Sequence, residues 1–378
     1  MDDLFYNVTV STTGVSHDLS NAVNTLTIDE ESGKPDQLTL TISDRYRVYG
    51  HAIQSGMGIE VDLGTESDHS VVFSGQVYRI EGKFLSDGVP IVRIVAHDRS
   101  KLMGLRIRNR PWTNTNLSGI VTNIGREYFG SLGVVTDILG DPEFTGNGIR
   151  QTEETDLTFL LRLAQTYGCE MYVELADDLE LLNFKSQRSI MSADPDVILY
   201  YGRCGVEHRL MSFNANSDIS NIQRERQLGG MDYDLGEATE MSTTSVEEVG
   251  STEDQFQAEN LVALARDQPL QTASLAPLMA VSSMAPQELG QYIQTTSREA
   301  IPTFTSAANL QAVSQNQFST RIHGMQGNGT MMGNHRVHAQ ASIDIADVGG
   351  QFSGIWYLSQ VRHIVDNQGY RTEFECQR

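Results

Sequence analysis

The sequence lacks the features of a membrane-spanning or secreted protein. No run reaches the roughly 18 apolar residues that a bilayer-spanning helix needs. The first residues, MDDLFYNVTV, contain neither the basic nor the apolar region of a signal peptide. The three cysteines, Cys169, Cys204 and Cys376, are odd in number and far apart, which predicts buried free thiols in a reducing cytoplasm. We therefore expect no membrane insertion and no structural disulfide.

Basic residues are scarce, and lysine is the scarcest. The chain has 27 lysines and arginines against 49 aspartates and glutamates, a formal net charge of −22. Tight binding to nucleic acid is not expected, because it needs a basic face that displaces counterions from phosphate. DNA can still pass along an acidic wall, which repels phosphate and does not hold the cargo. Solubility alone is the other explanation of the charge.

Catalytic and cofactor motifs are also missing. The chain has no GxxxxGK[ST] loop, no HExxH and no GxSxG. His335 and His338 lie in a stretch that reads as loop into strand, where side chains three apart point to opposite faces, so no metal site is predicted. His97-Asp98 ends a strand without a nucleophile motif nearby, and we interpret this pair as hydrogen-bonding a loop.

Adjacent acidic residues occur at Glu153-Glu154 and Asp177-Asp178. Such pairs are expected by chance in so acidic a chain, and a glycosidase needs its carboxylates held across a sugar-sized cleft. No segment is left over that looks like a lysozyme. The sequence predicts no catalytic, cofactor-binding or metal-binding residues, and a protein that is not an enzyme.

What the sequence does contain is a β-pattern that occurs twice. One copy reads IEVDLG, FSGQVYRIEG and VPIVRIVAHDR, and the other ASIDIADVGG, FSGIWYLSQVRHIV and GYRTEFECQR. Phe73 and Phe352 of the two FSG tripeptides are 279 positions apart. A unit used twice predicts two similar β-domains, with these two aromatics in equivalent, buried positions. Gly75 and Gly354 fit tight bends or bulges.

A small α/β insert separates the two copies. Apolar residues recur at helical spacing from Asn116 to a stop at Gly130, and again from Thr155 to Gly168. The runs CEMYVEL and LELLNF then predict a hairpin. VILYYG at 197–202 and IQRERQL at 222–228 read as strands.

The region between the insert and the second copy has weaker patterns. Residues 236–255 are rich in Glu, Ser and Thr, which predicts a loop. Helical propensity marks residues 254–266, 286–299 and 306–317. Gly327-Asn328-Gly329 is a turn signal.

Together these patterns predict a mainly β fold with an α+β insert: two similar antiparallel β-barrel or sandwich domains plus a small α/β domain. The predicted domains are residues 1–103, the first β-domain; 104–190, the small α/β insert; 191–245 with 318–378, the second β-domain; and 246–317, a helical or loop insertion.

Alternating arginines in LRIRNRPW place Arg106, Arg108 and Arg110 on one strand face. The alternatives are a solvated edge guarded by charge and a subunit contact, which arginine favours. We predict the contact, with Trp112 as an anchor within it. Trp356, on the second FSG strand, is predicted to lie in the core.

The ordered set of motifs carries a family resemblance. It comprises FSGQVYRIEG at 73–82, VRIVAHDRSKLM at 92–103, RPWTNTNLSGIVTNIGREYFG at 110–130, QTEETDLTFLLRLAQTYGCEMYVE at 151–174 and the ending from 352. In this order they resemble the tail-hub family of contractile injection machines: phage late control protein D, baseplate hub proteins and the hub part of type VI secretion spikes. Residues 236–317 depart from the family pattern.

The resemblance implies a structural baseplate hub in a phage virion or injection particle, made in the host cytoplasm. It implies a homotrimer whose two tube-like domains per chain form a pseudo-sixfold ring, joining a hexameric tail tube to a trimeric spike. We expect a separate spike protein and other baseplate proteins as partners. The alternatives are a wall-degrading hydrolase of the baseplate and a carbohydrate-binding β-protein.

Overall fold

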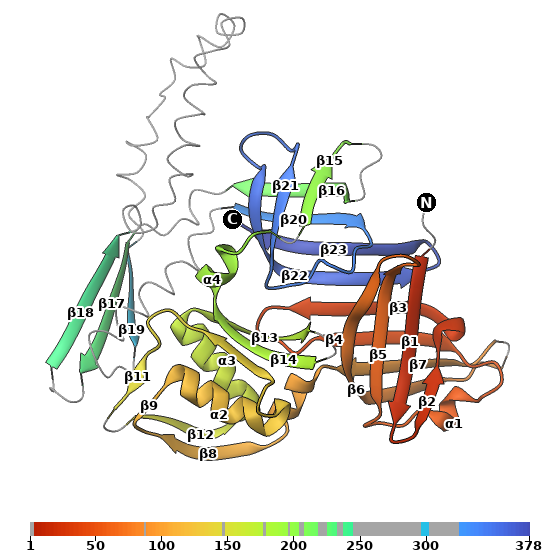
Figure 1. The fold of residues 1–378 in the computed structure, drawn as a ribbon, viewed down its shortest axis with the longest axis horizontal. Coiled ribbons are helices and arrows are strands. Elements are labelled where there is room, and N and C mark those ends of the chain that lie inside the picture. Colours follow the sequence, from red (N-terminus) through yellow and green to blue (C-terminus); the bar gives the residue numbers. More distant parts are fainter. Residues whose placement is uncertain are drawn as a thin grey trace, which may run out of the picture.

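The computed structural model describes residues 4–86, 88–145, 148–176, 179–195, 197–203, 208–217, 225–232, 237–244, 296–301 and 325–378. Strands dominate these ranges and helices are few (Figure 1). The prediction of a mainly β fold is confirmed.

The N-terminal part forms one seven-stranded stretch of sheet. Its strands, in spatial order, are β2 (Val15–Asp18), β1 (Leu4–Thr12), β5 (Gly58–Thr65), β6 (His69–Lys83), β7 (Ile91–His97), β4 (Gln37–Ser43) and β3 (Val23–Glu31). A 3-10 turn (Ser20–Ala22) and the short helix α1 (Tyr49–Ala52) lie between these strands in the chain. All pairings within this stretch are antiparallel.

The C-terminal part forms a closed barrel of six strands. They are β15 (Val197–Tyr201), β16 (Arg209–Ser217), β20 (Met325–Met332), β21 (Ser342–Ala346), β22 (Gly354–Asp366) and β23 (Gly369–Gln377). They follow the order β22-β21-β15-β16-β20-β23, and the pairing of β22 with β23 closes the ring. One expectation was wrong: the barrel is not wholly antiparallel, because β15 pairs parallel to both β16 and β21.

The two parts repeat one strand arrangement. We call β1, β3, β4, β5, β6 and β7 the first unit, and β15, β16, β20, β21, β22 and β23 the second unit. Numbered along the chain, the strands of each unit lie in the spatial order first, fourth, fifth, sixth, third, second. In the first unit no pairing joins the first and second strands within the described part, and β2 adds to the outer edge of β1.

Irregularities in the strands also recur at matching places. The register of β6 against β7 shifts at Tyr78, and that of β22 against β23 shifts at Ser359. The register of β3 against β4 shifts at Asn24, and that of β16 against β20 shifts at Met211. Since bulges are specific features of a strand pair, these positions fix residue-by-residue equivalence between the units.

The predicted equivalence of Phe73 and Phe352 was wrong by two residues. Phe73 lies five positions before the bulge at Tyr78, and the residue five positions before Ser359 is Gly354. Phe73 is buried within β6, whereas Phe352 is half-buried in a turn before β22 begins. The shared tripeptide FSG therefore occurs at the fifth strand of both units, but at positions that differ by two residues.

The insert between the units forms its own small domain-like cluster. It contains a 3-10 segment (Arg99–Gly104), β8 (Ile107–Trp112), β9 (Thr115–Asn116), α2 (Leu117–Phe129), β10 (Val134–Asp137), β11 (Glu143–Phe144), β12 (Ile149–Thr155), α3 (Asp156–Tyr167), β13 (Cys169–Ala176), β14 (Leu179–Ser186) and α4 (Gln187–Met191). The Asn116 side chain caps α2 and the Thr155 side chain caps α3. Both helices and the β13–β14 hairpin confirm the sequence predictions.

Buried apolar side chains gather in three clusters, one for each part. One lies in the insert, between Met103 and Phe184, and one in the first unit, centred on β3, β4, β5 and β7. The third fills the barrel of the second unit and contains Trp356, which is fully buried as predicted. In the last strand, β23, the alternating residues Thr372, Phe374 and Cys376 are also buried.

Three further predictions on the weakly patterned region were wrong. Gly327-Asn328-Gly329 lies inside strand β20 and is not a turn. A Cβ at Gly329 would lie 2.4 Å from the Phe374 ring, so glycine here makes room for an aromatic in the barrel core. Residues 237–244, predicted as loop, form strand β18 (Glu237–Thr244). Residues 296–299, predicted as the end of a helix, lie in strand β19 (Thr296–Ile301).

These two strands flank β17 (Glu225–Asp232) in a separate three-stranded sheet. Strands β17 and β18 are therefore not part of the barrel, although the sequence pattern assigned both to the second β-domain. The helical segments predicted at 254–266 and 306–317 lie outside the described residues.

Candidate functional site

One pair of strands joins the sheets of the two units. β3 of the first unit pairs antiparallel with β22 of the second, over Leu26–Glu31 and Gln360–Val365. This pairing makes one continuous sheet of thirteen strands (Figure 1). Asp29 lies opposite Arg362, and their side chains form an ion pair across the junction.

A polar cluster is buried beneath this junction. Glu30 of β3 is 5% exposed and His363 of β22 is fully buried. His338 Nδ1 lies 3.1 Å from a Glu30 carboxylate oxygen, and the Ala339 N–H donates to the other oxygen at 2.9 Å. The Tyr370 hydroxyl lies 2.8 Å from His363 Nδ1. The cluster joins β3, β22, β23 and the segment after β20 in one network.

Electrostatics in this cluster favour a charged Glu30 and a neutral His363. Burial opposes ionisation of Glu30, but the charge and hydrogen bond of His338 hold its pKa below the usual value. Burial lowers the pKa of His363 to about 4, although the Glu30 charge opposes that shift. Glu30, His338 and His363 offer donor atoms within 4.8 Å of one another. One carboxylate and two imidazoles are a donor set that zinc accepts, but Glu30 already has partners in His338 and the Ala339 N–H.

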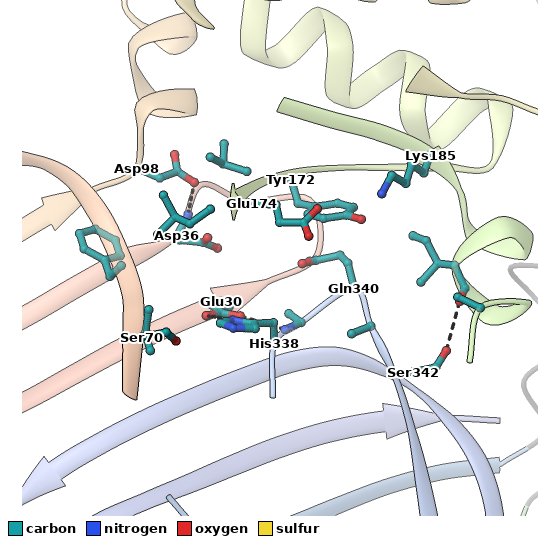
Figure 2. A pocket seen from close by; sticks show the side chains of 18 of the residues that line it. Glu30, Asp36, Ser70, Asp98, Tyr172, Glu174, Lys185, His338, Gln340 and Ser342 are labelled. Atoms are coloured by element: carbon teal, nitrogen blue, oxygen red, sulfur yellow. Dashed lines mark hydrogen bonds and ion pairs between the residues drawn. The ribbon is translucent and has the colours of Figure 1, made fainter. Parts of the chain in front are cut away.

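A cavity of about 500 Å³ opens beside the cluster (Figure 2). Its lining comes from β3, β6, the insert strand β13, helix α4 and residues 338–342. The cavity therefore lies where the first unit, the second unit and the insert meet. Pockets between domains are frequent ligand sites.

Two aspartates line the same cavity. The Asp36 N–H donates to Asp98 at 2.9 Å, and the Ser100 hydroxyl donates to Asp98 at 2.6 Å. Burial raises the pKa of Asp98 to about 6, against these hydrogen bonds, which lower it. Burial and the negative charge of Asp98 raise the pKa of Asp36 well above its usual value. The interpretation of His97-Asp98 as a pair that hydrogen-bonds a loop is confirmed, because both side chains contact Asp36.

The structure separates His335 from His338. His335 Nε2 lies 3.6 Å from Asp68 of the first unit, whereas His338 contacts Glu30. The HRVH segment thus links the second unit to the first at two places. Nothing in the sequence marked Glu30 or His363 as partners, because each lies in a strand that reads as an ordinary alternating pattern.

Arg108 and Arg110 form ion pairs within the insert. Both contact Glu127, and both lie within 4.0 Å of the fully buried Asp156. Arg108 and Arg110 are thus paired inside the chain, and Arg106 is exposed. Trp112 stacks on Phe159 and packs, partly buried, against the insert core. A subunit contact on this face, with Trp112 as an anchor, stays a prediction.

Glu154 pairs with Arg162, and Glu153 is exposed. Cys169 and Cys376 are buried free thiols, as predicted. Asp177, Asp178 and Cys204 lie outside the described residues. None of the helices in the described ranges is long and apolar enough to cross a bilayer.

A model of the family described as phage tail baseplate hub (GPD) matches residues 37–368. The chain belongs to this family. The match begins at Gln37, the first residue of β4, and ends at Gln368, just before β23. It therefore covers the insert, β22 and most strands of both units, and the repeated strand arrangement belongs to a baseplate hub protein. The family is a structural component of the baseplate. No curated protein matches the chain.

Solved structures share the fold of this hub protein at low sequence identity. A tail protein from Neisseria meningitidis MC58 matches with TM-score 0.64 and 14% identity, over 99% of this chain and 96% of that one. The 43 kDa tail protein of prophage MuSo2 from Shewanella oneidensis matches with TM-score 0.62 and 12% identity, over 99% and 98%. An E. coli component of the type VI secretion system, described as similar to T4 tail proteins gp27 and gp5, matches with TM-score 0.55 and 12% identity, over 94% and 73%.

Proposed function

We propose that this hub protein acts as a trimeric, pseudo-sixfold adaptor between a hexameric tail tube and a trimeric spike. The observation that supports this is the repeated strand order of the two units, with bulges at matching positions. Two similar units in each chain let three chains present six similar faces to a sixfold partner. The same three chains present three faces to a threefold partner.

In this proposal the two units, within residues 1–103 and within 191–245 and 318–378, are the tube-like domains. The insert at 104–190 braces them, and the role of 246–317 is left open. Partners are the tail tube protein, the spike protein and other baseplate proteins, in a virion or injection particle made in the host cytoplasm. The mechanism is symmetry matching and transmission of force, without catalysis.

Oligomeric state tests the proposal. Light scattering on the purified protein, and the symmetry of the assembled particle in electron microscopy, are expected to give three copies of this chain in a closed ring. A closed dimer or a closed hexamer of this chain in the particle would contradict the adaptor role. Zymography on peptidoglycan, run beside a lysozyme standard, is expected to show no clearing; a clear band would favour a wall-degrading enzyme instead.

A further inference from the structure

The junction inside each chain has an unused counterpart. The chain joins the second strand of its first unit, β3, to the fifth strand of its second unit, β22. By the equivalence of the units, the second strand of the second unit is β16 and the fifth strand of the first unit is β6. Within one chain β16 and β6 are not paired with each other.

Both counterpart strands have an open edge. Arg79–Lys83 of β6 pair with β7 on one side, and no described strand pairs with the other side, because β5 ends opposite Gln76. Ser212–Ser217 of β16 pair with β20 only, in the part of the chain that the structure covers. Most of these residues are exposed, whereas the equivalent residues of β3 and β22, apart from Thr25, are buried or half-buried.

The composition of the β16 edge favours pairing. Natural proteins protect edge strands with charge or proline, because an exposed edge is a template for another strand. Residues 212–217 read SFNANS, which has neither. A groove beside this edge is lined by Phe213, Asn214, Ala215 and Phe352 among others. Phe84, just beyond β6, is 66% exposed.

We propose that β16 of one subunit pairs antiparallel with β6 of the next subunit, in the register that β3 and β22 use within the chain. This proposal rests on the trimeric adaptor role. Each trimer then has six junctions of one kind, three within chains and three between them. The contact is head-to-tail, and such a contact closes into a ring when the rotation per step fits.

The bulges fix the register of the proposed contact. Glu81 lies three residues after the bulge at Tyr78, and Arg362 lies three residues after the bulge at Ser359, so Glu81 is equivalent to Arg362. In the same way Asn216, five residues after the bulge at Met211, is equivalent to Asp29, five residues after the bulge at Asn24. Because Arg362 lies opposite Asp29, Glu81 lies opposite Asn216 of the neighbour.

The same register gives the exposed side chain of Phe84 a partner in the neighbouring subunit. Phe84 corresponds to Val365 and Phe213 to Leu26, and these two counterparts lie opposite each other across β3 and β22. Phe84 of one subunit is therefore placed opposite Phe213 of the next, beside the groove at the β16 edge. Burial of Phe84 in that groove would stabilise the contact, since aromatic side chains dominate interface energetics.

Cysteine pairs test the register directly. In the double variant Glu81→Cys, Asn216→Cys, mild oxidation is expected to give a covalent ladder that ends at trimer on a non-reducing gel. Directly opposite Cβ atoms lie about 4.5–5.5 Å apart, whereas diagonal neighbours two residues along are about 7–8 Å apart. The matched control Glu81→Cys, Asn214→Cys is therefore expected to give much less cross-linking.

Further controls fix the direction of the contact and the background. Mixing the single variants Glu81→Cys and Asn216→Cys is expected to give covalent dimers only, and each single variant alone none. The unaltered chain shows how much cross-linking its three native cysteines give. The double variant Asp29→Cys, Arg362→Cys shows how readily a disulfide forms at the equivalent junction within one chain. Circular dichroism and thermal unfolding show whether each variant is folded.

The outcomes separate this contact from the adaptor role. A folded double variant that is trimeric by light scattering, yet cross-links no better than the offset control, would overturn the pairing and leave the adaptor role intact. A folded variant that is monomeric and gives no cross-link at high concentration would also overturn the pairing, because oxidation traps even transient contacts. The adaptor role would then be judged by the symmetry of the particle.

Discussion

At the residue scale, the buried ionisable groups at the meeting point of the three parts govern how the fold responds to pH. Asp98 and His363 are both buried, and burial shifts both pKa values toward the neutral form. The sign of the effect on stability differs. His363 costs stability as the pH falls from about 6.5 toward about 4, because the unfolded chain takes up the proton first. Asp98 costs stability as the pH rises.

Replacing Asp98 with asparagine is expected to remove one part of this pH dependence. Its folded pKa of about 6 lies above the usual value of 3.8, so the unfolded chain releases the proton at lower pH. Relative to the unaltered protein, the free energy of unfolding of Asp98→Asn should therefore rise between about pH 4 and pH 6, by on the order of 2 kcal/mol. Urea unfolding at a series of pH values measures it.

An exposed aspartate supplies a control of opposite sign. The Ser20 hydroxyl and N–H lower the pKa of Asp18 below its usual value of 3.8, so Asp18→Asn should lose stability relative to the unaltered protein as the pH rises from below that lowered pKa to above 3.8. Parallel curves for Asp98→Asn and the unaltered protein would contradict a proton held at Asp98.

At the scale of elements, capping residues close in the chain determined the two helices of the insert, whereas packing against distant strands determined that the glycine-rich segment of β20 is a strand. Asn116 and Thr155 cap α2 and α3 through contacts three residues away, so the chain nearby was enough to place them. Gly329 reads locally as a turn, but it faces Phe374 in a strand that is 45 residues distant. Pairing with β16 and β23 decided the conformation there.

A methyl group at Gly329 is therefore expected to destabilise the barrel. The added Cβ would lie 2.4 Å from the Phe374 ring in a closed core, and overpacking of this kind costs about 1–3 kcal/mol. Chemical denaturation of Gly329→Ala measures the change. Gly350→Ala is the matched control, because its Cβ would meet nothing within 4 Å and its φ is not positive. Equal stability of the two variants would contradict the packing described for β20.

At the scale of the whole molecule, the effect of the net charge of −22 depends on where the acidic residues lie in the assembled ring. We expect part of this charge to line the channel of the trimeric ring, while the junctions between subunits are near neutral. Exposed charges are screened beyond about 10 Å at 0.1 M salt, but many carboxylates around one narrow channel add their potentials. Polyanionic cargo would then pass without binding.

An electrostatic map of the assembled ring checks this expectation. A neutral or basic channel, with the acidic residues spread over the outer wall, would contradict it and leave solubility as the explanation. The uncharged edge of β16 is consistent with a near-neutral junction, because residues 212–217 contain no ionisable side chain.

The sequence by itself determined the class of the fold, the two helices of the insert, the hairpin after them and the family. These depend on periodicity, on caps and on ordered motifs, which are local properties of a chain. The recurrence of FSG indicated a repeated unit, but its alignment of Phe73 with Phe352 was two residues out. A two-residue slip keeps every side chain on the same face, so the alternating pattern cannot detect it.

Only the tertiary structure decided which strands meet. The pairing of β3 with β22 joins residues more than 300 positions apart, and it brings Glu30 beside His338 and His363. The partners of Arg108 and Arg110 are likewise set by how β8 lies against α2 and α3. Contacts of this kind depend on the spatial order of strands, and that order is fixed by the packing of the cores and not by any residue's neighbours in the chain.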